Sequence, residues 1–231
     1  SKWLSELSSR KHTYRVVFIP ETIGSITYLS NHIDHLKQHV VAGFNIICIG
    51  DERCYSYMPS RDGDTLADKV SLHVLKFVDP EFKQYDYLSR GSDERQYCSP
   101  GVDLPIVSIM RSKYLEYPEY HNSLDNLDFI TPKGLAGGFN VLQKAIEVIE
   151  RNCVPKVTVF CEPHLSKHGL YPTLSTEATY EIVKQMMNLI AYSDGKHSLL
   201  DIAEIIGEPF WELFPICQKL EGTVMQMFEN E

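Results

Sequence analysis

The sequence predicts an α/β fold, a mostly parallel sheet flanked by helices, followed by a small winged-helix-like module. Three observations lead to this expectation: short apolar runs, amphipathic stretches between them, and a helix–turn–helix spacing near the end of the chain. Strands are expected at 14–19, 44–50, 104–110 and 155–160, and helices at 25–41, 65–78, 139–151, 179–191 and 210–220. We expect the α/β domain over residues 1–176 and the winged-helix-like module over residues 177–231.

Composition places the chain among ordinary globular proteins. Hydrophobic residues make up 43% and charged residues 23% of its 231 residues, which argues against disorder. The formal charge of -9 argues against a nucleic-acid surface over the whole molecule. The six cysteines are scattered without a C-x-x-C pair, and no apolar run reaches the roughly 18 residues of a membrane span. We therefore expect a cytoplasmic protein with reduced thiols, without a membrane contact or a cysteine-based zinc site.

The first expected strand, 14–19, is β-branched and aromatic and stops at Pro20. Glu21 follows, where a central strand leads into a functional loop. Two roles are open for this carboxylate: a group of the site, or a negative charge at the N-terminus of the next helix. That helix carries three histidines among solvated polar residues, which we expect at the surface: His32, His35 and His39.

Two further loops carry candidate residues. The second strand ends in Gly50-Asp51, and α/β enzymes hold catalytic carboxylates on such turns after buried strands. A solvated turn aspartate is the alternative for Asp51. The loop 60–64 contains Arg61, whose planar guanidinium could bind a substrate carboxylate.

Residues 91–129 are the most informative stretch. Its middle, 104–110, is a short apolar run typical of a buried strand, so chemistry belongs on the loops at its ends. The upstream loop holds Ser92-Asp93-Glu94-Arg95. Downstream, His121 follows an aromatic and acidic loop and precedes further aspartates. A histidine among carboxylates there suits a metal ligand oriented by neighbouring acids, and a histidine that caps the loop is the alternative.

The last third offers weaker signals. The Gly-rich stretch 134–138 lacks the G-K-S/T ending of a phosphate loop. The helix 210–220 holds Glu212 against a lone Lys219, which favours a protein contact or an intramolecular brace over DNA reading.

Several of these motifs together resemble a known family. The order S-D-E at 92–94, G-x-x-x-P-I-V at 101–107 and Y-H-N-S-x-D-N-L-D at 120–128 is similar to the last third of the catalytic domain of co-catalytic zinc aminopeptidases. The loop 161–172 resembles the G-E-P-x-L-G-K-R-G-L-Y-P motif of a bacterial aminopeptidase-like family, with three departures. That family is often linked to polysaccharide biosynthesis and carries a winged helix after this domain. The resemblance spans nearly all of the chain.

The resemblance implies a zinc-exopeptidase-like fold and aminopeptidase-like hydrolysis of an amide bond by a metal-bound water. It implies that Asp51 and His121 are zinc ligands. Glu21 would be the general base or a ligand, because the family has two glutamates where this chain has Pro20 and one glutamate. Candidate substrate-binding residues are Arg61, Asp93 and Tyr120. The substrate would be a peptide or a small aminoacyl-type molecule.

The family carries further metal-binding residues in an H-P-x-x-x-N-D-N segment that this sequence does not contain. Because three candidate ligands are too few for two zinc ions, we expect weak or absent zinc binding by this chain and two ions in the complete protein. The rival hypothesis is a catalytically inactive scaffold or regulator that acts through protein contacts of the winged helix. A DNA-binding regulator is a third hypothesis, and oligomer formation is open.

Overall fold

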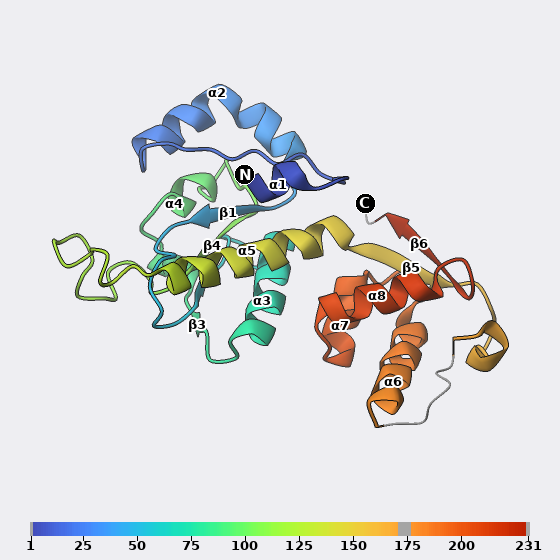
Figure 1. Ribbon diagram of the computed structural model, residues 1–231. Helices are drawn as coiled ribbons and strands as arrows, with labels where there is room; N and C mark the ends of the chain where they lie inside the picture. Colours follow the sequence, from blue (N-terminus) through green and yellow to red (C-terminus); the bar gives the residue numbers. More distant parts are fainter. Residues whose placement is uncertain (1, 171–176, 230–231) are drawn as a thin grey trace. The chain divides into compact units, whose positions relative to one another are not determined.

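The computed structural model describes residues 2–170 and 177–229 of the chain (Figure 1). It divides into two compact units, residues 1–146 and 147–231, and the division falls within one long helix, α5 (Pro132–Arg151). The expected domain boundary after residue 176 lies outside the described residues.

The first unit is built on a four-stranded sheet in the order β1-β4-β2-β3. Its strands are β1 (Gly43–Ile46), β2 (Ser56–Met58), β3 (Lys83–Gln84) and β4 (Ile106–Met110). The pairs β1–β4 and β2–β3 are parallel, whereas β2 and β4 are antiparallel. The mixed α/β class and the parallel-rich sheet are confirmed. The run Tyr55-Ser56-Tyr57 resembles an edge strand in sequence, but β2 lies between β4 and β3 inside the sheet and is buried.

Helices surround this sheet. They are α1 (Lys2–Glu6), α2 (Ile23–His39), α3 (Leu66–Val78), the short α4 (Glu94–Tyr97), the 3-10 helix η1 (Tyr87–Ser89) and α5. The helix α3 packs against β4, and α2 packs against α4. Leu29 and Leu36 of α2 meet Leu104 in one core cluster. The expected helices 25–41 and 65–78 are thus confirmed within about two residues at each end.

The start of α3 shows why its sequence forms a helix there. The Thr65 hydroxyl accepts a hydrogen bond from the backbone N–H of Asp68, and the Asp68 carboxylate accepts from the backbone N–H of Thr65. This reciprocal capping box satisfies two backbone donors that a helix start leaves unpaired. The Asp68 carboxylate is fully buried and also accepts from Tyr57 and Ser60.

The helix α5 begins at Pro132, seven residues before the expected start at Phe139. The Thr131 hydroxyl accepts from the backbone N–H of Gly134 at 2.9 Å, so Thr131 acts as the N-cap and Pro132 takes the first helical position, which proline favours. A Cβ on Gly134 would lie 2.0 Å from the carbonyl oxygen of Gly50. Glycine therefore lets this helix end lie directly against the turn after β1.

The strand expected at 14–19 was wrong. These residues form no strand, and the Phe18 side chain is 89% exposed. Among the described residues, no backbone hydrogen bond joins 15–19 to another segment. β-branched and aromatic residues favour an extended backbone, but a strand also needs a neighbouring backbone to pair with.

The second unit combines a two-stranded ribbon with three helices. Its elements are β5 (Cys153–Val157), η2 (Leu165–His168), α6 (Glu177–Tyr192), α7 (Leu199–Ile206), α8 (Phe210–Leu220) and β6 (Met225–Glu229). The strands β5 and β6 pair antiparallel, and the three helices pack on one another. Ser198 forms a capping box with Asp201 at the start of α7, and Gly207 ends that helix in a left-handed conformation. The expected helix–turn–helix spacing is confirmed.

Candidate active site

A pocket of about 360 Å³ lies in the first unit, where β1 and β4 end. These strands are parallel, so their carboxyl ends meet at one edge of the sheet, the place where open α/β sheets bind ligands. The pocket is lined by five segments: the residue after Pro20, the turn after β1, Ser92 before α4, the loop after β4 and Leu135 of α5. Its polar and aromatic lining residues include Glu21, Cys48, Asp51, Ser92, Tyr114, Tyr117, Tyr120, His121, Asp125 and Phe129.

Asp51 lies in the turn after β1, and its side chain is buried, with 3% of the residue exposed. Its Oδ1 accepts hydrogen bonds from the backbone N–H of Arg53 at 2.9 Å and from the Ser112 hydroxyl at 2.8 Å. Its Oδ2 accepts from the backbone N–H of Ser112 at 2.8 Å. Asp51 therefore joins the turn after β1 to the segment that leaves β4.

The loop that carries Glu21 is held by the motif at 92–95. The Asp93 carboxylate accepts from the backbone N–H of Thr22 at 2.7 Å, and the Arg95 guanidinium donates to the Thr22 hydroxyl at 2.7 Å. Thr22 has a φ of 63°, a left-handed conformation that is costly for a β-branched residue. These two contacts stabilise the strained residue and fix the direction of the chain beside Glu21.

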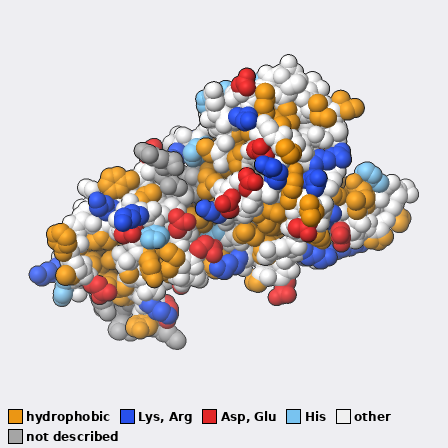
Figure 2. Space-filling model, turned by 180° about the vertical axis from the view of Figure 1, so that it is seen from behind, with side chains coloured by type: hydrophobic (Ala, Val, Ile, Leu, Met, Phe, Trp, Pro, Cys, Tyr) orange, Lys and Arg blue, Asp and Glu red, His pale blue; other side chains and the backbone are white. Residues whose placement is uncertain are grey.

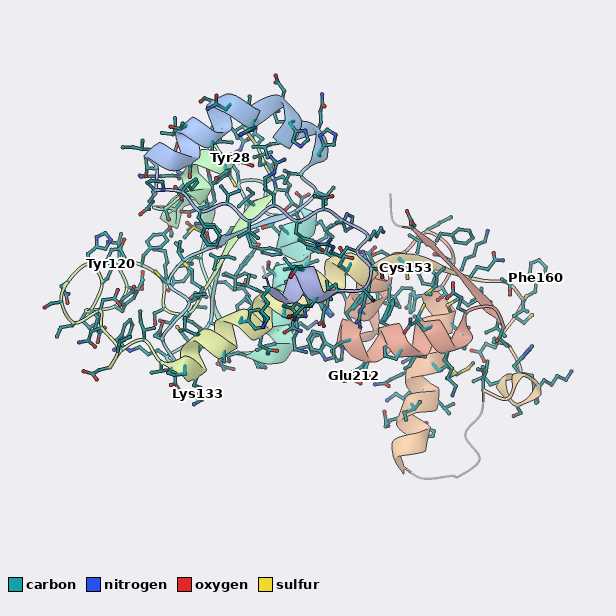
Figure 3. All side chains as sticks on the ribbon, turned by 45° about the horizontal axis from the view of Figure 1, so that its top comes forward. Tyr28, Tyr120, Lys133, Cys153, Phe160 and Glu212 are labelled. Carbon is teal, nitrogen blue, oxygen red and sulfur yellow. The ribbon has the colours of Figure 1, made fainter. Side chains whose placement is uncertain are left out.

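The loop 111–131 carries His121 and has no regular secondary structure. Figure 3 shows Tyr120 on this loop, at a distance from Lys133 in the first turn of α5. The Tyr120 and His121 rings stack at 3.9 Å, and Tyr117 meets Tyr120 edge to face at 5.6 Å. Tyr117 also stacks on Phe129 at 5.1 Å. The pocket wall on this side is thus a continuous set of aromatic contacts that ends at the imidazole.

One arginine ties this loop to the turn after β1. The Arg53 guanidinium donates two hydrogen bonds to the Glu119 carboxylate, at 2.7 and 2.8 Å. It also lies over the Phe129 ring, 4.7 Å from the centroid. The hydrogen bond from Arg53 holds the pKa of Glu119 below its ordinary value.

Several pocket groups stay neutral near pH 7. Partial burial raises the pKa of the Cys48 thiol and of the Tyr117 and Tyr120 hydroxyls, and the charge of Glu21 raises that of Tyr120 further. The Tyr117 hydroxyl donates to the Cys48 sulfur at 3.5 Å. The wall therefore offers neutral rings and hydroxyls beside the carboxylates.

Glu94, which belongs to the S-D-E motif but received no role from the sequence, is a buried carboxylate next to this site. It is fully buried and accepts from the backbone N–H of Gly91 and Ser92, from the Asn45 amide and from the Tyr114 hydroxyl. Its contacts fix the 91–95 loop against the sheet. Glu94 is consequently part of the scaffold that supports the pocket.

The structure brings together four of the six candidate residues from the sequence. Glu21, Asp51, Tyr120 and His121 all line the pocket. Arg61 lies elsewhere and pairs with Asp103 at 2.6 Å, and Asp93 supports Thr22 as described above.

The sequence did not indicate Cys48, Tyr117 and Asp125, which also line the pocket. They lie on an irregular loop or turn where no periodic pattern marks an inward-facing side chain. The Y-H-N-S-x-D-N-L-D motif that contains Asp125 is the signal that could have identified it.

The described residues do not fit a zinc site by themselves. Among residues 2–170 and 177–229, no group of three or more His, Cys, Asp or Glu side chains could hold a metal ion. Asp51 already accepts three hydrogen bonds, which occupy most of its acceptor sites. One acceptor site, on Oδ2, stays open beside the hydrogen bond from Ser112.

The charges on α8 bear on whether the second unit binds nucleic acid. The exposed residues of α8 include one acid, Glu212, and one base, Lys219. Figure 2 shows Lys and Arg side chains interspersed with Asp and Glu over the face in view. The face in view and the helix α8 therefore show no basic stripe of the kind typical of DNA readers. None of the helices in the described ranges is long and apolar enough to span a membrane.

Comparison with known proteins gives two strong similarities. A Clostridium acetobutylicum protein named "Putative polysaccharide biosynthesis protein with aminopeptidase-like domain" is 40% identical over 212 residues, which cover 91% of this chain and 48% of that protein. The crystal structure of a "putative peptidase" from the same species superposes with a TM-score of 0.87 at 36% identity, over 98% of this chain and 50% of the other. This chain thus spans about half the length of these relatives.

Family models account for the two units in turn. A winged helix-turn-helix model matches residues 153–225, which contain β5 and the helices α6, α7 and α8 of the second unit. Residues 1–152, which include the whole pocket, match a model described as a domain of unknown function, DUF4910. That match covers more than half of the sequence, and we conclude that the chain belongs to the DUF4910 family, with a winged helix-turn-helix domain at its C-terminal end.

Proposed function

We propose that the first unit is an aminopeptidase-like hydrolase domain and that its pocket binds a peptide or a small aminoacyl-type substrate. The observation that carries this proposal is the convergence of Glu21, Asp51 and His121, from three separate segments, in one pocket. The names of the two relatives support the same class of reaction. Because those relatives are about twice as long, the activity of a whole protein of this kind is part of the proposal.

The chain's own residues would have distinct roles. Glu21 is exposed at the pocket rim, so its carboxylate can accept a proton from a water that attacks an amide carbonyl. His121 lines the same pocket on the aromatic loop and can orient the substrate or this water. Asp51 holds Ser112 and the turn after β1 in place through its three hydrogen bonds.

Zinc would supply a polarised carbonyl and an activated water in a co-catalytic enzyme. Since the described residues do not fit such a site, we assign no step to the metal in this chain. We expect calorimetric titration of zinc into the chain to show weak binding or none. A stoichiometric, tight binding isotherm would contradict this expectation.

The test of the enzyme proposal is the release of an N-terminal amino acid from short peptides, with and without added zinc. We expect Glu21→Gln to lower the rate by about a hundredfold or more, because it removes the proton acceptor and keeps the shape of the side chain. Asp62→Asn is the matched control, since this exposed acid lies outside the pocket. Equal rates for the wild type and Glu21→Gln would reject Glu21 as the base.

A second candidate function is a catalytically inactive scaffold or regulator that contacts proteins through the winged helix. The hydrogen bonds that already occupy Asp51 and the mixed charges of α8 favour it. No amino-acid release under any metal condition, together with a protein partner lost on Glu212→Lys, would support this candidate. A salt-sensitive gel shift with DNA would support a DNA-binding regulator over both.

A further inference from the structure

We propose that Arg53 is a positioning residue that holds the loop 111–131 closed against the pocket and thereby sets the place of His121. The effect of Arg53 on substrate, through His121, rests on the proposed function. The effect of Arg53 on the order of the loop is independent of that function, because it follows from contacts within the chain.

Arg53 contacts the loop at two separated points. Its guanidinium binds Glu119 with two parallel hydrogen bonds and lies over the ring of Phe129, ten residues further along. Planar, two-pronged binding of a carboxylate and stacking on a ring are both properties of arginine that lysine lacks. One side chain thus closes the part of the loop between residues 119 and 129.

The base of Arg53 is itself fixed. Its backbone N–H donates to Asp51 Oδ1, and Asp51 is anchored to Ser112. The guanidinium therefore starts from a rigid turn at the end of β1 and reaches the loop from there. Motion of the loop requires the two guanidinium contacts to break, whereas the turn can stay in place.

A series of aromatic ring contacts connects Arg53 to His121. Phe129 under Arg53 stacks on Tyr117, Tyr117 meets Tyr120, and Tyr120 stacks on His121. His121 has a φ of 57°, so its backbone is in a conformation that few residues adopt without support from their surroundings. The side chains of 121–128 are exposed, which leaves this part of the loop with few buried contacts to hold it in place.

The experiment compares hydrogen exchange of the amides of 111–131 in the wild type and in Arg53→Ala. We expect exchange in this loop to rise about tenfold, because an ion pair and a cation–π contact are lost together. Arg53→Lys keeps the positive charge but loses the planar guanidinium with its two parallel donors. The exchange rate of the loop amides in this variant should therefore lie between those of the wild type and Arg53→Ala. Arg61→Ala is the matched control for loop order, since it removes a similar ion pair, to Asp103, from a different loop.

A second readout follows His121 directly. Carbethoxylation by diethylpyrocarbonate, mapped by mass spectrometry, should rise about threefold at His121 in Arg53→Ala, because the imidazole leaves its stack on Tyr120. The reaction at His73, which is buried on α3, should not change. A general loss of stability would raise the reaction at His73 as well and would overturn the proposal.

The outcomes separate this inference from the proposed function. Loop exchange in Arg53→Ala equal to the wild type, or equal to Arg61→Ala, overturns the positioning role whatever the activity. Looser loop exchange in a protein that releases no amino acid from any peptide supports the positioning role and counts against the hydrolase. Where Arg53→Ala does not fold, Glu119→Gln tests the same ion pair from the other side, with the same expected direction.

Discussion

Asp51 and Asp68 are both buried carboxylates of the first unit, yet their surroundings differ. Asp68 accepts from five donors on Tyr57, Ser60 and Thr65, all within eleven positions of it, and it lines neither described pocket. Asp51 accepts from three donors, two of them on Ser112, 61 positions away, and it lines the pocket. An enclosed, saturated carboxylate stabilises local structure, whereas a less saturated one at a strand end can also act on a ligand.

The largest effect should follow Asp68→Ala. Removal of the carboxylate leaves buried hydroxyl and backbone donors without an acceptor and removes one of the two hydrogen bonds of the α3 capping box, the one from the backbone N–H of Thr65. We expect the free energy of unfolding to fall by about 3–5 kcal/mol, measured by urea denaturation. Asp62→Ala, an exposed control on the neighbouring loop, should change it by about 0.5 kcal/mol or less. A loss below about 1 kcal/mol for Asp68→Ala would show that its hydrogen bonds are not the structural element inferred here.

Asp51→Asn should have an intermediate effect on stability and a large one on the site. The amide keeps one acceptor oxygen but turns the other acceptor into a donor, which faces the donors on Ser112 or Arg53. We expect a loss of about 1–2 kcal/mol in the same denaturation experiment. Any amino-acid release should fall by about tenfold or more, because the turn and the Ser112 segment shift. Unchanged stability with unchanged activity would remove the distinction drawn between the two carboxylates.

Asp194, an exposed carboxylate in the second unit, extends the comparison. Its substitution should change the free energy of unfolding least. The backbone N–H groups of Lys196 and His197 lower the pKa of Asp194 to about 2. A lowered pKa in the folded state contributes stability above the unfolded value, about 3.9, and this contribution is lost as pH falls from about 4 toward 2. The loss should be small, since the side chain is 42% exposed.

The measurement is the unfolding free energy of wild type and Asp194→Asn at pH 5 and at pH 2.5. The difference between the two proteins should shrink at the lower pH. A difference that grows on acidification would mean that the protonated form of Asp194 is the stabilising one.

Local patterns predicted much of the fold. The helices α2, α3 and α8 could be predicted because their apolar spacing lies within a few residues of sequence, and α3 also has a capping box at its start. The early start of α5 was missed although Thr131-Pro132 carries the signal, since the glycines after it resemble a loop. The expected strand at 14–19 failed because pairing depends on a partner that propensity does not specify.

The site was predictable to the extent that motifs marked it. The resemblance singled out Glu21, Asp51 and His121, and the structure places all three at one pocket, while their chemical roles stay predictions. Arg53 carries no motif and is a common surface type, so its two-point contact with the loop emerges from coordinates alone. Irregular loops are set by tertiary contacts, and single-sequence patterns are weakest there.

The close approach of α5 to the turn after β1 makes Gly134 a marker that can be followed in other sequences. A methyl group at this position would collide with the carbonyl of Gly50, and the helix would have to withdraw from the residue that precedes Asp51. Relatives that keep the acid together with a glycine here should keep the cavity, and a relative with alanine here should have a displaced helix start. This pair of positions therefore allows a family to be sorted by site architecture before any member is assayed.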